Sequence, residues 1–220
     1  MDQKLINSLE QELYSLFKNV YEDGGGYGFR YQHSLRVMRY CQKIASYPRF
    51  QNHNINLNAL LIGGLFHDIG KIIAVDEKGH LIYGNYGGIS HDQAGAEIAP
   101  KYLKKYISDK KLIDLICLII SEQENKKETT TIESQIVKDA DRLDHYGVLH
   151  LWCSVTYANY HQKNIEGLKE FWEGEEGLSL CQKCLSEFFF SEVKAIAEKR
   201  LQHLKQATDF MFNEQEGKDL

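Results

Sequence analysis

Proline is scarce in this chain, where only Pro48 and Pro100 interrupt 220 residues. Because proline breaks helices, most of the chain is free to form them. Apolar residues recur at three- and four-residue steps, as in residues 5–17 (LINSLEQELYSLF) and 188–212 (FFFSEVKAIAEKRLQHLKQATDFMF), which is the period of amphipathic helices. We therefore expect an all-α helical bundle, with room for one short β-hairpin near residues 73–83.

The sequence also lacks long apolar runs and an excess of basic residues. No run approaches the roughly 20 residues of a membrane span, and the polar start MDQKLINSLEQELY does not resemble a signal peptide. A net charge of −5 argues against a protein that grips a long nucleic acid, since such proteins present a basic face. We expect a cytoplasmic protein without a membrane or a long nucleic acid as partner.

Cysteine is limited to five positions: Cys41, Cys117, Cys153, Cys181 and Cys184. An odd number in helical surroundings favours reduced thiols over a disulfide framework. The pair in CQKC, residues 181–184, has no second pair to complete a zinc site, so core or half-buried thiols are predicted.

Two strongly polar side chains end an otherwise apolar segment. His67 and Asp68 follow ALLIGGLF within the stretch LFHDIGK, residues 65–71. His33 in RYQHSLRVMRYC and Asp141 in KDADRLDHYG also sit on helices with apolar neighbours. A buried carboxylate without a partner costs several kcal/mol, roughly 3–5 when its ion pair is broken. Four such residues on three helices point to a shared metal ion.

Two imidazoles and two carboxylates form a mixed nitrogen and oxygen set that suits Mn, Fe, Co, Ni or Zn ions better than calcium. Adjacent residues diverge by about 100° around an α-helix. His67 and Asp68 therefore reach one ion only near the end of their helix, where Gly70 allows the turn to loosen. Gly63 and Gly64 would let another helix approach that face closely.

This ordered set resembles the HD-domain metal-dependent phosphohydrolases with an HDIG-type motif, an all-helical family. The match lies in HSLRV at His33, HDIGK at His67 and DADRLD at Asp141. The resemblance implies that His33, His67, Asp68 and Asp141 bind the metal, with Asp139 as the alternative to Asp141. We expect one domain over residues 1–220, with a motif-bearing core at about 27–150 completed by C-terminal helices at 155–215.

Several neighbours could meet a phosphate. By the resemblance, Asp68, His91 and Lys71 are the catalytic candidates: Asp68 orients water, Lys71 offsets phosphoryl charge and His91 protonates the leaving oxygen. Ser90 and Gln93 form a capping-box pattern that would place His91 in the first turn of a helix. The candidates for substrate binding are Arg30, Arg142 and His145.

The implied activity is hydrolysis of a phosphate ester or anhydride in a small phosphorylated metabolite, with a nucleotide favoured. Mg is a further candidate metal. One ion is expected rather than two, because Gln123 or Glu122 takes the place where two-metal relatives carry another histidine.

Two alternatives stay open: a non-catalytic HD-fold protein that senses a ligand or partner, and a di-iron oxygenase. A homo-oligomer is also open, since Phe188, Phe189 and Phe190 suit either the core, which we favour, or a dimer face.

Overall fold

The computed structural model describes residues 2–123 and 129–220. It is helical almost throughout, as the sequence predicts. Its contacts divide the chain into two compact units, which are described separately. The first comprises Met1–Glu22 and Gly26–Asp141, and the second comprises Asp23–Gly25 and Arg142–Leu220. The single domain expected from the sequence stays a prediction.

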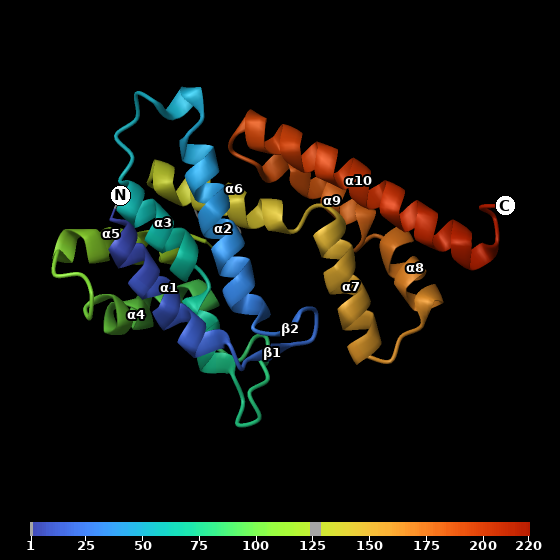
Figure 1. The fold of residues 1–220 in the computed structure, drawn as a ribbon, viewed down its shortest axis with the longest axis horizontal. Coiled ribbons are helices and arrows are strands. Elements are labelled where there is room, and N and C mark those ends of the chain that lie inside the picture. The colour runs from blue at the N-terminus through green and yellow to red at the C-terminus, as the bar shows by residue number, and fades with distance from the viewer. Residues whose placement is uncertain (1, 124–128) are drawn as a thin grey trace. The chain divides into compact units, whose positions relative to one another are not determined.

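The first unit is built from helices and one small sheet (Figure 1). In chain order its elements are α1 (Gln3–Phe17), β1 (Tyr21–Glu22), β2 (Gly26–Tyr27), α2 (Phe29–Ala45), the 3-10 helix η1 (Pro48–Phe50), α3 (Leu57–Phe66), the 3-10 helix η2 (Ile69–Ala74), α4 (His91–Leu103), α5 (Lys110–Ser121) and the greater part of α6 (Ile132–Asp144).

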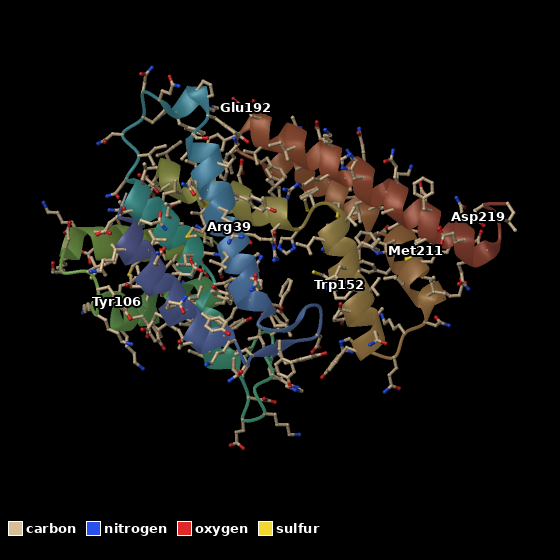
Figure 2. The ribbon with its side chains drawn as sticks, in the orientation of Figure 1. Arg39, Tyr106, Trp152, Glu192, Met211 and Asp219 are labelled. Carbon is tan, nitrogen blue, oxygen red and sulfur yellow. The ribbon has the colours of Figure 1, made fainter. Side chains whose placement is uncertain are left out.

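Helix α3 is the centre of this unit. It is apolar on every side, which is typical of a helix buried all round, and its residues 59–66 are all buried. It packs against α1, α2 and α5. Tyr106, which follows α4 and is labelled in Figure 2, donates its hydroxyl to Glu12 of α1 at 2.9 Å. The pair His67–Asp68 directly follows Phe66, so the motif begins where this buried helix ends.

The two glycines of α3 allow its neighbours to come close, as predicted. A Cβ atom built on Gly63 would lie 2.7 Å from Cγ2 of Ile119 on α5, and one built on Gly64 would lie 2.9 Å from Sγ of Cys41 on α2. Both distances are below normal van der Waals contact. The glycines thus set the spacing of the helices around the site.

The hairpin expected near residues 73–83 is a turn with one antiparallel bridge, between Val75 and Leu81, rather than a strand ladder. Asp76 donates its backbone N–H to the carbonyl of His80 at 2.8 Å. A two-stranded sheet forms earlier instead, with Tyr21 opposite Tyr27. Its two strands flank the glycine-containing turn of residues 23–25.

The second unit consists of α7 (Val148–Tyr160), α8 (Ile165–Glu173), α9 (Leu178–Cys184), the 3-10 helix η3 (Leu185–Glu187) and α10 (Ser191–Glu216). Its core includes Trp172, which is 1% exposed, and Phe190, which is 3% exposed, whereas Phe189 is 43% exposed. Figure 2 labels Glu192 in the first turn of α10 and Asp219 just beyond its C-terminal end. The cysteines are free, with Cys41 buried and the others partly exposed, as the sequence predicts.

The sequence led us to expect no apolar run near the length of a membrane span, but one stretch of the described residues, Leu57–Ala74, is long and apolar enough to cross a membrane by length and composition. Most of it, 72%, is buried inside the protein. The same test is passed by the core helix of a folded domain, which is what α3 is.

We predict that Gly63→Ala lowers the free energy of unfolding by about 1–3 kcal/mol, because the new methyl group overlaps the branched side chain of Ile119. Urea denaturation measures this. Gly167→Ala is the control, since a Cβ there would meet its nearest atom at an ordinary 3.6 Å; alanine in that helix is neutral or stabilising by up to about 1 kcal/mol. Equal stability of Gly63→Ala and wild type would contradict the packing described.

Candidate metal centre

His67 and Asp68 lie at the junction between the α-helix α3 and the 3-10 helix η2. Helix α3 ends at Phe66, His67 is its C-terminal cap, and Asp68 has φ −102° and ψ 11° at the start of η2. This is the helix end that the sequence predicts. The change of helical form lets neighbouring side chains face one point, with Nε2 of His67 3.4 Å from Oδ2 of Asp68.

Gly70 explains how α4 reaches this junction. A Cβ atom on Gly70 would lie 1.9 Å from the carbonyl oxygen of His91 and 2.5 Å from the backbone nitrogen of Gly95. No side chain fits there, so η2 and the first turns of α4 meet backbone to backbone. As a result Nε2 of His91 lies 3.4 Å from Oδ1 of Asp68.

The four residues predicted as metal ligands come together. Nε2 of His33 lies 3.2 Å from Nε2 of His67 and 3.5 Å from Oδ2 of Asp68. Oδ1 of Asp141 lies 3.1 Å from Nε2 of His33 and 3.5 Å from that of His67. His33, His67 and Asp68 are at most 3% exposed, and the side chain of Asp141 is 31% exposed. Of these four side chains only that of Asp141 is partly exposed, so solvent reaches the cluster beside Asp141.

The donor set fits a divalent cation. Nδ1 of His67 lies 2.8 Å from the carbonyl oxygen of Gly64, and because a carbonyl only accepts, Nδ1 carries the hydrogen and Nε2 of the neutral ring is the ligand atom. Burial alone would lower the pKa of His67, but the charges of Asp68 and Asp141 raise it to about 10. The cluster thus attracts positive charge, which a metal ion would supply.

Two further cations neutralise Asp68. Nζ of Lys71 lies 2.9 Å from Oδ2 of Asp68, and Nη1 of Arg30 donates to the same oxygen. Burial acts to raise the pKa of Asp68, yet Lys71, His67 and Arg30 hold it well below its usual range. The side chain of Asp68 is therefore held in its ionised form.

Arg30 also binds Glu22, a contact that the sequence did not reveal. Nε donates to Oε1 of Glu22 at 2.9 Å and Nη2 donates to Oε2 at 2.5 Å. The hydroxyl of Tyr83 donates to Oε2 of Glu22 at 2.6 Å. Glu22 precedes three glycines and Tyr83 lies in a polar stretch, so no local pattern marks either residue.

The N-terminus of α4 holds His91 in place. Ser90 caps the helix and forms the predicted capping box with Gln93. Burial lowers the pKa of His91, which disfavours the charged ring and makes its protonated form a stronger acid. The ring of Tyr86 lies 5.7 Å from the ring of His91.

Arg142 and His145, predicted to bind substrate, belong to the second unit. Nη1 of Arg142 donates to the carbonyl oxygen of Glu187 at 2.7 Å. Helix α6 ends at Asp144, so His145 lies in the turn after it. The ring of His145 is 5.9 Å from that of His150. The role assigned to both stays a prediction.

The alternative ligand Asp139 is fully buried on α6. At the place of the missing histidine, Oε1 of Glu122 accepts hydrogen bonds from the backbone N–H and hydroxyl of Thr130, at 3.0 and 2.6 Å. Gln123 donates its amide to the carbonyl of Ile119 at 2.6 Å. The polar span that the sequence places here runs on through residues 124–128, which lie outside the described residues.

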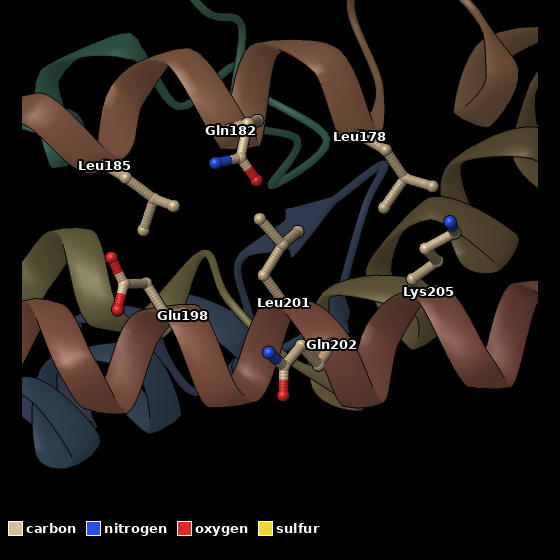
Figure 3. A pocket seen from close by; sticks show the side chains of 7 residues that line it. All are labelled: Leu178, Gln182, Leu185, Glu198, Leu201, Gln202 and Lys205. Carbon is tan, nitrogen blue, oxygen red and sulfur yellow. The ribbon is translucent and has the colours of Figure 1, made fainter.

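The second unit contains a groove whose lining has no histidine or cysteine. It has a volume of about 320 Å³ and lies between α9 and α10 (Figure 3). The residues that line it are Leu178, Gln182, Leu185, Glu198, Leu201, Gln202 and Lys205. None of these lining residues is a histidine or cysteine, so the His33 cluster is the better candidate for the functional site.

We predict that Asp141→Asn weakens binding of Mn²⁺ or Co²⁺ by about 10-fold or more while the helical circular dichroism is unchanged, because one ligand loses its charge at a partly exposed position. Isothermal titration of the metal measures this. The control is Asp114→Asn, at an exposed position of α5. Wild-type metal affinity in Asp141→Asn would remove Asp141 from the ligand set.

The sequence and fold were compared with known proteins. A profile of the HD domain matches residues 30–146, more than half of the chain, and it covers His33, His67, Asp68 and Asp141. HD domains bind divalent metals. None of the curated proteins matches.

Solved structures share the fold. A predicted HD superfamily hydrolase from an uncultured Thermotogales bacterium aligns with a TM-score of 0.60 at 18% identity, over 94% of this chain and 91% of its own. YpgQ of Bacillus subtilis in complex with ADP gives 0.63 at 18%, over 99% and 95%. An HD-superfamily hydrolase from Bacillus thuringiensis gives 0.65 at 16%, over 98% and 99%. Together with the profile, these likenesses lead to one conclusion: the chain belongs to the HD domain family and has the HD-superfamily hydrolase fold.

Proposed function

We propose that this protein is a metal-dependent phosphohydrolase that cleaves an ester or anhydride of a small phosphorylated metabolite, with a nucleotide as the favoured class. The observation that carries the proposal is the cluster of His33, His67 and Asp68, whose ligand atoms lie within 4.8 Å of one another. Asp141 lies against both imidazoles, and Lys71 and His91 lie against Asp68. The complex of YpgQ with ADP supports a nucleotide as ligand. A bound divalent ion would polarise a phosphoryl oxygen and lower the pKa of a bound water toward about 7.

Asp68 is suited to orient the attacking water. Its Oδ2 is engaged by the imidazoles, Lys71 and Arg30. Its Oδ1 faces His91 at 3.4 Å. The first oxygen is therefore occupied by the cluster, and the second can accept a hydrogen bond from the attacking water.

Lys71 and His91 supply the remaining groups. Lys71 uses one of its three N–H bonds on Asp68 and is 13% exposed at its side chain, which leaves donors for a phosphoryl oxygen. His91 is 28% exposed at its side chain and begins a capped helix, whose free N–H groups favour anions. We assign it to the departing oxygen, to which it donates a proton.

The direct test is a screen of nucleoside monophosphates, triphosphates, cyclic dinucleotides and sugar phosphates with Mn²⁺, Co²⁺, Ni²⁺ and Mg²⁺ in parallel. We expect release of phosphate or of a nucleotide with at least one metal, loss of turnover with a chelator and recovery when the metal is added back. Asp141→Asn serves as the inactive control. Absence of both bound metal and turnover would favour the alternative, a non-catalytic protein that senses a ligand.

With a substrate in hand, we predict that His91→Gln lowers kcat by about 10²–10⁴-fold, the range expected when a general acid is removed. The metal affinity should stay near that of the wild type, because His91 is not one of the four ligands. His53→Gln, at an exposed position after η1, is the matched control. A kcat equal to that of the wild type would show that another group protonates the leaving oxygen.

A further inference from the structure

A buried carboxylate outside the candidate ligand set is joined to Asp68 through Arg30 and to a glycine-rich segment through Tyr83. Glu22 is 1% exposed, although it lies in a two-residue strand beside a turn. Both of its oxygens are used, since it accepts two hydrogen bonds from Arg30 and one from Tyr83. A carboxylate this buried is held by its partners and holds them in turn.

Arg30 joins Glu22 to the metal ligand Asp68. Its Nε and Nη2 donate to Glu22, Nη2 also lies 3.1 Å from the hydroxyl of Tyr83, and Nη1 donates to Oδ2 of Asp68. Each nitrogen of the planar guanidinium therefore has a fixed partner. The guanidinium group is planar and rigid. When Glu22 holds Nε and Nη2, the direction of Nη1 is fixed as well, so the position of Glu22 determines how Arg30 meets Asp68.

Tyr83 connects the same network to residues 82–88. Its ring is 57% exposed, while its hydroxyl reaches the buried Glu22. Beyond it, Gly84, Gly87 and Gly88 have φ values of 86°, 71° and 85°, which glycine adopts at no steric cost. Backbone of this kind has few intrinsic restraints, so side-chain anchors decide where it lies.

The segment meets the site at further points. Nζ of Lys71 lies 5.9 Å from the centre of the Tyr83 ring, and Tyr86, which is 8% exposed, packs its ring near His91. Tyr83 thus lies beside Lys71, which the proposed function assigns to the phosphoryl group, and Tyr86 lies beside His91, which it assigns to the leaving oxygen.

We infer that Glu22 and Tyr83 are positioning residues of the metal centre: through Arg30 they fix the carboxylate of Asp68, and through the Tyr83 hydroxyl they hold residues 82–88 beside the site. Arg30 acts in this network and not as the phosphate-binding arginine expected from the sequence. The inference rests on the proposed function only in its consequence for turnover, because the network is present in the protein without substrate.

Tyr83→Phe tests the inference, because it removes the hydroxyl and keeps the ring. We expect the dissociation constant for Mn²⁺, measured by titration against a competing chelator, to rise about 10-fold, the lower end of what loss of an outer partner costs a metal site. We also expect faster amide hydrogen exchange in residues 82–88 of the metal-free protein. Glu22→Gln should produce both effects more strongly, with a 10–100-fold rise (roughly) in the dissociation constant.

The control is Tyr27→Phe, whose ring is 69% exposed on β2, and it should leave both measurements unchanged. If Glu22→Gln does not fold, Tyr83→Phe still decides the question. Wild-type metal affinity together with wild-type exchange at 82–88 in Tyr83→Phe would overturn the inference. Altered affinity and exchange in a protein that hydrolyses no phosphorylated compound would uphold it and reject the phosphohydrolase proposal instead.

Discussion

The first unit depends on one buried carboxylate, that of Asp68. It is 3% exposed, a position in which an unpaired charge would be strongly unfavourable. Its charge is offset from three directions: Arg30 comes from α2, Lys71 from η2 and His67 from the end of α3. Each compensating group must lie within a few ångströms of the same oxygen. The requirement to balance this charge therefore fixes the arrangement of the elements that surround it.

Such an arrangement demands helices closer than ordinary side chains permit. Gly70 and Gly95 let η2 and α4 meet through their backbones, and Gly63 admits Ile119 against α3. A methyl group at any of these contacts would push a helix away from the junction, and a shift of about 1 Å is enough to spoil a catalytic or metal-binding geometry. The glycines of the motif region are thus packing residues whose effect is felt at the ligands.

The candidate ligands could be picked out in the sequence because each is a polar residue within an apolar helical pattern. The cap of α4 at Ser90 was equally legible, since a capping box spans four consecutive residues. Glu22 and Tyr83 could not be predicted, because they meet across 61 positions of the chain and neither stands out from its neighbours. The end of α6 could not be predicted for a related reason: helix ends are set by local backbone geometry, here before Gly147 with a φ of 98°, which periodicity does not reveal.

The contacts of Arg30 and Lys71 suit these two cations to different roles. Arginine is always charged and planar, which suits it to a fixed network, whereas lysine is a flexible point charge with three donors. Arg30 is 6% exposed and each of its nitrogens has a protein partner. Among the described residues, Lys71 donates a hydrogen bond to Asp68, and its side chain is more exposed, at 13%. On these grounds Arg30 suits the positioning role that we infer for it, and Lys71 suits the role that the proposed function gives it, to offset the charge of an arriving phosphoryl group.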